Sequence, residues 1–167
     1  MRRLLVLLVF LLCFTGCLTG RTFELDPKWK PLVSVEEATD KIMPPQTTTT
    51  IGEHCYVSDL AQWLKDYPPG SIQQEALLRH EQLHAIRQLS YPLGIETWLL
   101  KYISEPSFRW EEEKLGYEQE ITWLVQHGVY VYPPLWASYM SNNYSSMVSF
   151  EDAQAWVEAT IRKAQGN

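Results

Sequence analysis

Cysteine is scarce in this chain of 167 residues, which contains only three. Cys13 lies inside an N-terminal apolar run and Cys17 just after it, so Cys55 has no partner in the remaining sequence. We therefore expect no disulfide framework of the kind that stabilises small secreted domains. Cys55 is expected to be a small buried apolar residue rather than a metal ligand.

Basic residues are in the minority, with 14 Lys and Arg against 20 Asp and Glu and a formal net charge of −6. An acidic chain offers no basic face to a phosphate backbone, so we expect no nucleic-acid partner. Apolar residues make up 46% and aromatic residues 13% of the chain. This composition and length are typical of one folded domain with a core of its own.

The sequence also lacks an apolar run of the about 20 residues that cross a bilayer comfortably. Its longest run, residues 4–14, has eleven residues and follows Arg2 and Arg3. A positive start and an apolar core of this length predict a signal peptide, which we place at residues 1–16. The protein is therefore expected to be exported.

Thr15 and Gly16 precede Cys17 at the end of this segment. The ending resembles the bacterial lipobox, although Phe14 stands where a lipobox usually carries an aliphatic residue. The resemblance implies that Cys17 is lipidated, becomes the mature N-terminus and anchors the protein to the bacterial envelope. Secretion after ordinary cleavage and an uncleaved N-terminal membrane anchor are the alternatives.

The predicted lipid anchor can be tested by substitution of Cys17. Cys17→Ser should abolish lipid labelling and change the mass of the processed protein, because the thiol is the group that accepts the lipid. A mature chain that starts elsewhere and carries an unmodified Cys17 would contradict the assignment.

Residues 17–50 contain four prolines and the four consecutive threonines at 47–50. This composition predicts an extended tether and an irregular segment, in which Ser34 and Glu37 could begin a short helix. We place the folded domain at residues 51–167. Its pattern predicts an α+β fold that is mostly helical with a small β element.

Ser71, Ser107 and Ser149 mark the starts of three helices, and Gly128 follows the end of the second. The expected elements are β segments at 51–58 and 129–132, helices at 60–67, 71–90, 95–103, 107–127 and 149–163, and an irregular, partly helical wall at 135–147.

The most informative motif is His80-Glu81-Gln82-Leu83-His84, on the helix expected at 71–90. Two histidines four residues apart share one helix face, about 6 Å apart, and can reach the same Zn²⁺ ion. Glu81 lies beside them, where it can take a proton from water without being a ligand. An exposed helix that carries two histidines by chance is the non-functional interpretation.

Zinc needs a third protein ligand, and no histidine follows His84 at the metzincin spacing. The helix expected at 107–127 offers Glu111, Glu112 and Glu113. Glu113 falls on the stripe of Trp110 and Tyr117, where an unpaired carboxylate would be costly to bury. We assign Glu113 as the ligand and keep Glu112 as the reserve; a buried ion pair of Glu113 with an arginine is the structural alternative.

The HExxH motif followed by a helix with Glu113-Lys114-Leu115-Gly116 resembles the gluzincin-type zinc metallopeptidases over roughly residues 50–127. The resemblance implies a minimal zincin-like domain, in which the small Gly116 lets the Glu-bearing helix approach the HExxH helix. The family usually places an acidic partner of a ligand histidine where this chain has Tyr117, so Tyr117 could take that role.

Several side chains could also contact the metal ligands or donate to the transition state. Gln88 lies one turn beyond His84, on the metal side or facing solvent. The other candidates, each of which could equally be structural, are His54, His127, Tyr102, Tyr117, Tyr130 and Tyr132.

The implied activity is zinc-dependent peptide hydrolysis at the envelope: His80, His84 and Glu113 hold one Zn²⁺ per chain and Glu81 acts as general base. A non-catalytic, zinc-stabilised lipoprotein that binds a partner is the first alternative. A hydrolase of non-peptide amides is the second.

Overall fold

A computed structural model describes residues 19–38, 47–143 and 147–166. The predicted signal peptide and Cys17 lie outside the described residues, so export and lipidation stay predictions. Within the ranges that the structure describes, no helix combines the length and the apolar character needed to cross a membrane.

A four-stranded sheet forms one side of the molecule. Its strands are β1 (Thr19–Glu24), β2 (Ser34–Ala38), β3 (Thr48–Ile51) and β4 (His54–Val57), in the order β1-β2-β4-β3. β2 and β4 are parallel, and the two outer pairs are antiparallel. β3 is an edge strand, and it lies beside the helix that carries the HExxH motif.

The prediction of an extended tether is wrong for the described residues. β1 and β2 belong to this sheet, and Trp29, Leu32 and Val35 are buried in its core. A helix start at Ser34 is also wrong, since Ser34 is the first residue of β2. A local capping signal is weaker than a strand that can pair on both sides.

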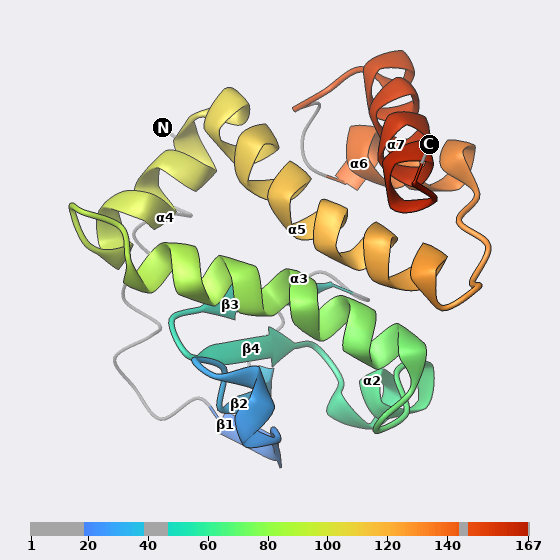
Figure 1. Cartoon of the computed structure of the whole chain (residues 1–167). Coiled ribbons are helices and arrows are strands. Elements are labelled where there is room, and N and C mark those ends of the chain that lie inside the picture. Colours follow the sequence, from blue (N-terminus) through green and yellow to red (C-terminus); the bar gives the residue numbers. More distant parts are fainter. Residues whose placement is uncertain (1–18, 39–46, 144–146, 167) are drawn as a thin grey trace.

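Six α-helices follow in the described part of the chain, which makes the fold α+β and mostly helical, as predicted. They are α2 (Leu60–Asp66), α3 (Ile72–Leu89), α4 (Ile95–Ser104), α5 (Pro106–Gln126), α6 (Pro133–Asn143) and α7 (Phe150–Ala164). Figure 1 shows α3 lying across the sheet, α5 beside α3, and α6 and α7 on the far side of α5. The short α4 sits at one end of the α3–α5 pair.

Two of the three expected helix caps are confirmed. The Ser71 hydroxyl accepts a hydrogen bond from the Gln74 backbone N–H, and Ser149 accepts one from Asp152. The third is wrong, because α5 begins one residue before Ser107, at Pro106. Proline is favoured at the first helical position, where no backbone N–H is needed.

The chain after α5 also differs from expectation. Gly128 has φ of +73°, which suits its place just beyond the helix end. Residues 129–132 form no strand, and the wall expected to be only partly helical is mostly the helix α6. Consecutive prolines open that helix at Pro133, where their fixed φ angle is compatible with the first turn.

α3 separates two hydrophobic cores. One lies between the sheet, α2 and α3, and the other among α5, α6 and α7 with Ala76 of α3 at its edge. Apolar residues do not define the buried side of α3, since Ile72 and Ile86 are 36% and 46% exposed. The buried faces of α3 instead include His80 and His84, so the motif lies inside the molecule.

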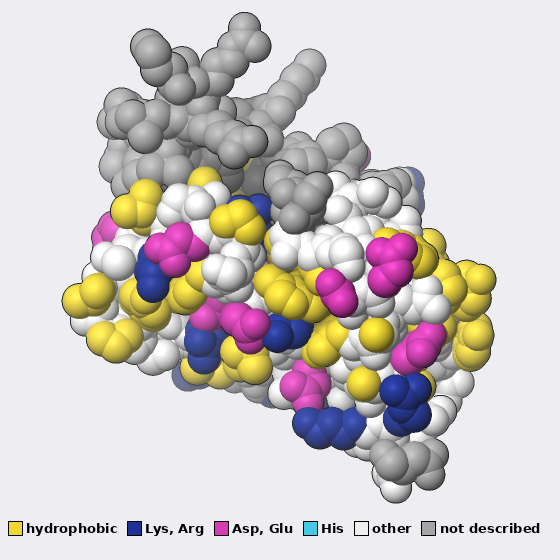
Figure 2. Space-filling model, turned by 90° about the horizontal axis from the view of Figure 1, so that it is seen from above, with side chains coloured by type: hydrophobic (Ala, Val, Ile, Leu, Met, Phe, Trp, Pro, Cys, Tyr) yellow, Lys and Arg dark blue, Asp and Glu magenta, His cyan; other side chains and the backbone are white. Residues whose placement is uncertain are grey.

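Figure 2 shows one outer face, on which acidic and basic side chains alternate with hydrophobic ones and no histidine is visible outside the grey atoms.

Candidate metal centre

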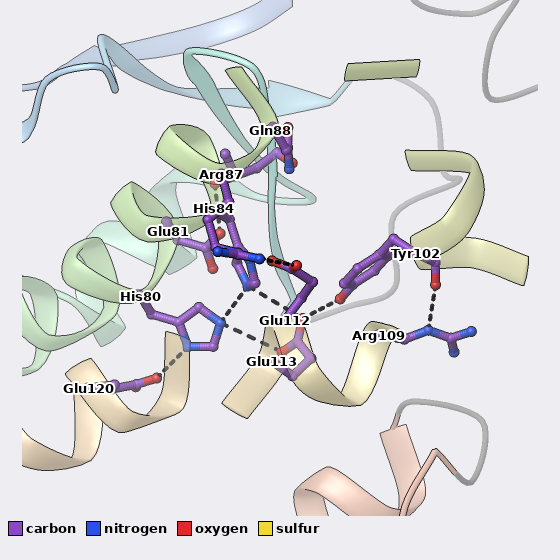
Figure 3. Close-up of polar contacts among 11 residues, drawn as sticks. His80, Glu81, His84, Arg87, Gln88, Tyr102, Arg109, Glu112, Glu113 and Glu120 are labelled. Atoms are coloured by element: carbon purple, nitrogen blue, oxygen red, sulfur yellow. Dashed lines mark hydrogen bonds and ion pairs between the residues drawn. The ribbon is translucent and has the colours of Figure 1, made fainter. Parts of the chain in front are cut away.

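His80, His84 and Glu113 converge between α3 and α5 (Figure 3). The two imidazole Nε2 atoms are 2.9 Å apart. Glu113 places Oε1 at 3.4 Å from His84 Nε2 and Oε2 at 3.6 Å from His80 Nε2. One ligand atom from each residue lies within 4.8 Å of the others, and all three side chains are buried. The three residues can therefore hold a metal ion, as the motif predicts.

The carboxylate of Glu113 fits a cation by its surroundings as well. Its Oε2 atom is buried and has no hydrogen-bond partner within the described structure. Burial alone would raise the pKa of Glu113, but the close approach of His80 and His84 holds that pKa far below its ordinary value. A charged carboxylate with an open oxygen, facing two imidazoles, is a donor set that Zn²⁺ accepts.

The acidic side chains around the site also shift the pKa of His80. Burial alone would lower its pKa, but contacts with Glu113 and Glu120 outweigh burial and raise the pKa well above the ordinary value. The site therefore favours positive charge at this position. A metal cation bound by the same residues would satisfy that preference and displace the proton.

Burial does not distinguish the two candidate glutamates. Glu112 and Glu113 are each 1% exposed, although only Glu113 was placed on the apolar stripe of the helix. Their partners differ: both Glu112 oxygens accept hydrogen bonds from the Arg87 guanidinium, one of them at 2.6 Å. Glu113 is the one that faces the histidines.

The acidic partner of a ligand histidine is Glu120, which the sequence interpretation missed. Its Oε2 atom lies 3.1 Å from His80 Nδ1. Tyr117, proposed for this role, packs its ring at a right angle against the His80 imidazole, with 4.5 Å between ring centroids. Helical spacing could have found Glu120, since it stands two turns beyond Glu113 on the same helix.

Glu81 is held by a strand that had been interpreted as part of the tether. Thr50 on β3 donates a hydrogen bond of 2.7 Å to Glu81 Oε2, and its hydroxyl lies 3.3 Å from the Cys55 sulfur. Burial raises the pKa of Glu81, although His80, His84 and Thr50 oppose that shift. The carboxylate is therefore fixed beside the ligands and is a stronger base than an exposed glutamate.

Gln88 does not face solvent and, within the described residues, makes no hydrogen bond to His80, His84 or Glu113. It is 1% exposed, accepts a hydrogen bond from the Gly52 backbone N–H and donates one to the Thr50 carbonyl. Gln88 thus fastens β3 to α3 and helps to place Thr50 beside Glu81.

The remaining candidate donors lie either at the site or away from it. Tyr102 reaches the site, where its hydroxyl donates a short hydrogen bond to Glu113 Oε1. His127 lies at the exposed end of α5, roughly 21 Å along the helix from Glu113 at 1.5 Å per residue. His54 instead contacts Ser34 and Glu36 in the sheet. Tyr130 and Tyr132 are 81% and 52% exposed.

Gly116 allows the two helices of the site to touch. A Cβ atom added there would lie 2.5 Å from His80 Cδ2, which is closer than side-chain atoms approach. The small residue expected from the gluzincin motif therefore has a steric reason: α5 passes directly against His80, one of the three residues that can hold a metal ion.

Gly116→Ala is accordingly expected to weaken metal binding by roughly 10–100-fold, the range seen when the support of a ligand is disturbed. The methyl group must push away either His80 or α5. Metal affinity from chelator competition measures the effect, and Leu115→Ala on the exposed side of the same helix is the control. An unchanged affinity in Gly116→Ala would show that the helices adjust freely.

No protein-family model, curated protein or solved structure matches this chain. The geometry of the described residues therefore supports the metal-binding cluster on its own, while the gluzincin assignment stays a prediction.

Proposed function

We propose that the protein is a zinc-dependent peptide hydrolase of the gluzincin type. The observation that carries the proposal is Glu81, a buried carboxylate that contacts none of the three cluster residues by a hydrogen bond but lies beside them on α3. A site that only stabilised the fold would have no use for a buried base in this position.

Two imidazoles and one carboxylate are a donor set that suits zinc, and its ligands would be His80, His84 and Glu113. When bound, zinc lowers the pKa of water and polarises a substrate carbonyl group. Glu120 keeps the His80 ring oriented through Nδ1, which leaves Nε2 for the metal.

The proton transfers belong to Glu81. Its carboxylate accepts a proton from the water that attacks the peptide carbonyl, and then donates this proton to the leaving amine. Thr50 holds Oε2 of the carboxylate during both steps, so that Oε1 is the oxygen directed to the proton.

Removal of the metal tests the function. The purified protein should contain one zinc per chain and cleave members of a broad peptide library. 1,10-Phenanthroline should abolish cleavage, and added Zn²⁺ should restore it, because the ligands remain in place. A protein that binds zinc stoichiometrically but cleaves no peptide would instead favour the zinc-stabilised binding module or a non-peptide amide substrate. Tethering through Cys17 stays a separate prediction.

A further inference from the structure

We infer that Tyr102 is a positioning residue for Glu113, and that its hydroxyl group sets the metal affinity of the site. The inference rests on the proposed metal centre but not on the hydrolysis of any substrate. The two glutamate oxygens carry the argument. Tyr102 donates a hydrogen bond to Oε1, whereas the buried Oε2 has no hydrogen-bond partner in the described structure.

This asymmetry is what a ligating carboxylate needs. When one oxygen is held by a donor, the rotation of the carboxylate is restricted and the other oxygen keeps a defined direction. Ligand carboxylates in metal sites are typically hydrogen-bonded in this way. In Figure 3 the Tyr102 side chain points from α4 toward Glu113, on the opposite side from His80.

The neighbouring Glu112 shows the contrast. Arg87 binds both oxygens of Glu112 and neutralises its charge. Tyr102 is a neutral donor, so it holds Glu113 without cancelling the negative charge. Of two adjacent buried carboxylates, only Glu113 therefore keeps its charge available for a cation.

Tyr102 is itself held in place before any metal binds. Its ring stacks on Trp98, one turn earlier in α4, with 4.9 Å between centroids and 15° between planes. Its backbone carbonyl accepts a 2.8 Å hydrogen bond from Arg109 of α5, which also donates to Ile103 at 3.0 Å. These contacts fasten the end of α4 to α5, so little conformational freedom is lost when the hydroxyl meets Glu113.

The test is the zinc affinity of Tyr102→Phe, measured on the full chain by competition with a chromophoric chelator. We expect the Kd for zinc to rise about 10–100-fold, as is typical when a partner of a ligand is removed. Phenylalanine keeps the ring that stacks on Trp98. Tyr130→Phe, which removes an exposed hydroxyl of the same kind, should leave the Kd unchanged.

A double-mutant cycle shows whether the hydroxyl acts through Glu113. Tyr102→Phe should weaken zinc binding strongly in the wild-type background and no further in Glu113→Ala. Equal losses in both backgrounds, or an unchanged Kd in the single variant, would overturn the inference. If Tyr102→Phe does not fold, Arg109→Gln loosens the same end of α4 and should raise the Kd by a smaller factor; no change there would also overturn it.

The outcomes separate this inference from the proposed function. A wild-type protein that binds zinc but cleaves no peptide refutes the hydrolase, while the change in Kd still supports Tyr102. A Tyr102→Phe protein with wild-type zinc affinity and a lower kcat would assign the hydroxyl to the substrate, and the positioning role would be wrong. If the wild type binds no zinc, both fail.

Discussion

Glu81→Gln should retain the metal and lose peptide hydrolysis, with kcat lower by about 10²–10⁴-fold. The amide keeps the size of the side chain and can still accept the hydrogen bond from Thr50. It cannot take a proton from water. The measurements are zinc content and the initial rate on a peptide that the wild type cleaves.

Glu75→Gln is a matched control, because Glu75 lies on the same helix and pairs with Lys28 outside the site. It should cleave at the wild-type rate. Cleavage by Glu81→Gln at that rate would refute the general-base mechanism. Loss of zinc from Glu81→Gln would show instead that Glu81 is a ligand, contrary to the geometry in which it contacts Thr50.

Glu113→Ala should weaken zinc binding by more than about 10²-fold, beyond the 10–100-fold typical of a residue that only supports a ligand. It removes one of three ligands, and it leaves His80 and His84 without the negative charge they face. Chelator competition gives the affinity, and thermal unfolding with and without zinc gives the stabilisation by the metal.

Glu112→Ala is the matched comparison, since it removes an equally buried carboxylate one residue away. It should lower the melting temperature because Arg87 loses its partner, but Arg87 is 40% exposed and can turn to water. Zinc binding should stay within a few-fold of the wild type. Equal loss of zinc from both variants, or loss from Glu112→Ala alone, would show that the ligand assignment is wrong.

Local features of the sequence predicted the contacts that span one or two turns of a helix. Ser71 and Ser149 cap helices through a backbone N–H three residues on, and His80 and His84 share a face because they are four residues apart. Such contacts depend on helix geometry alone.

The sequence interpretation failed where a partner comes from a distant part of the chain. The threonine run at 47–50 has the composition of a linker, yet Thr50 lies in an edge strand against Glu81 because β4 and Gln88 hold it there. Ser34 was expected to begin a helix, but β1 and β4 pair with β2 on both sides. Strand pairing is a long-range interaction that composition does not encode.

The sequence by itself therefore determined that HExxH lies on a helix, and it favoured Glu113 as the third residue of the cluster with Glu112 as the reserve. Only the tertiary structure decided which groups hold them. Glu112 and Glu113 are chemically identical, and their roles differ because α3 brings Arg87 to one and the histidines to the other. Glu120 and Tyr102 reach the site for the same reason: a side chain's partner is set by how the helices pack, and burial alone does not select it.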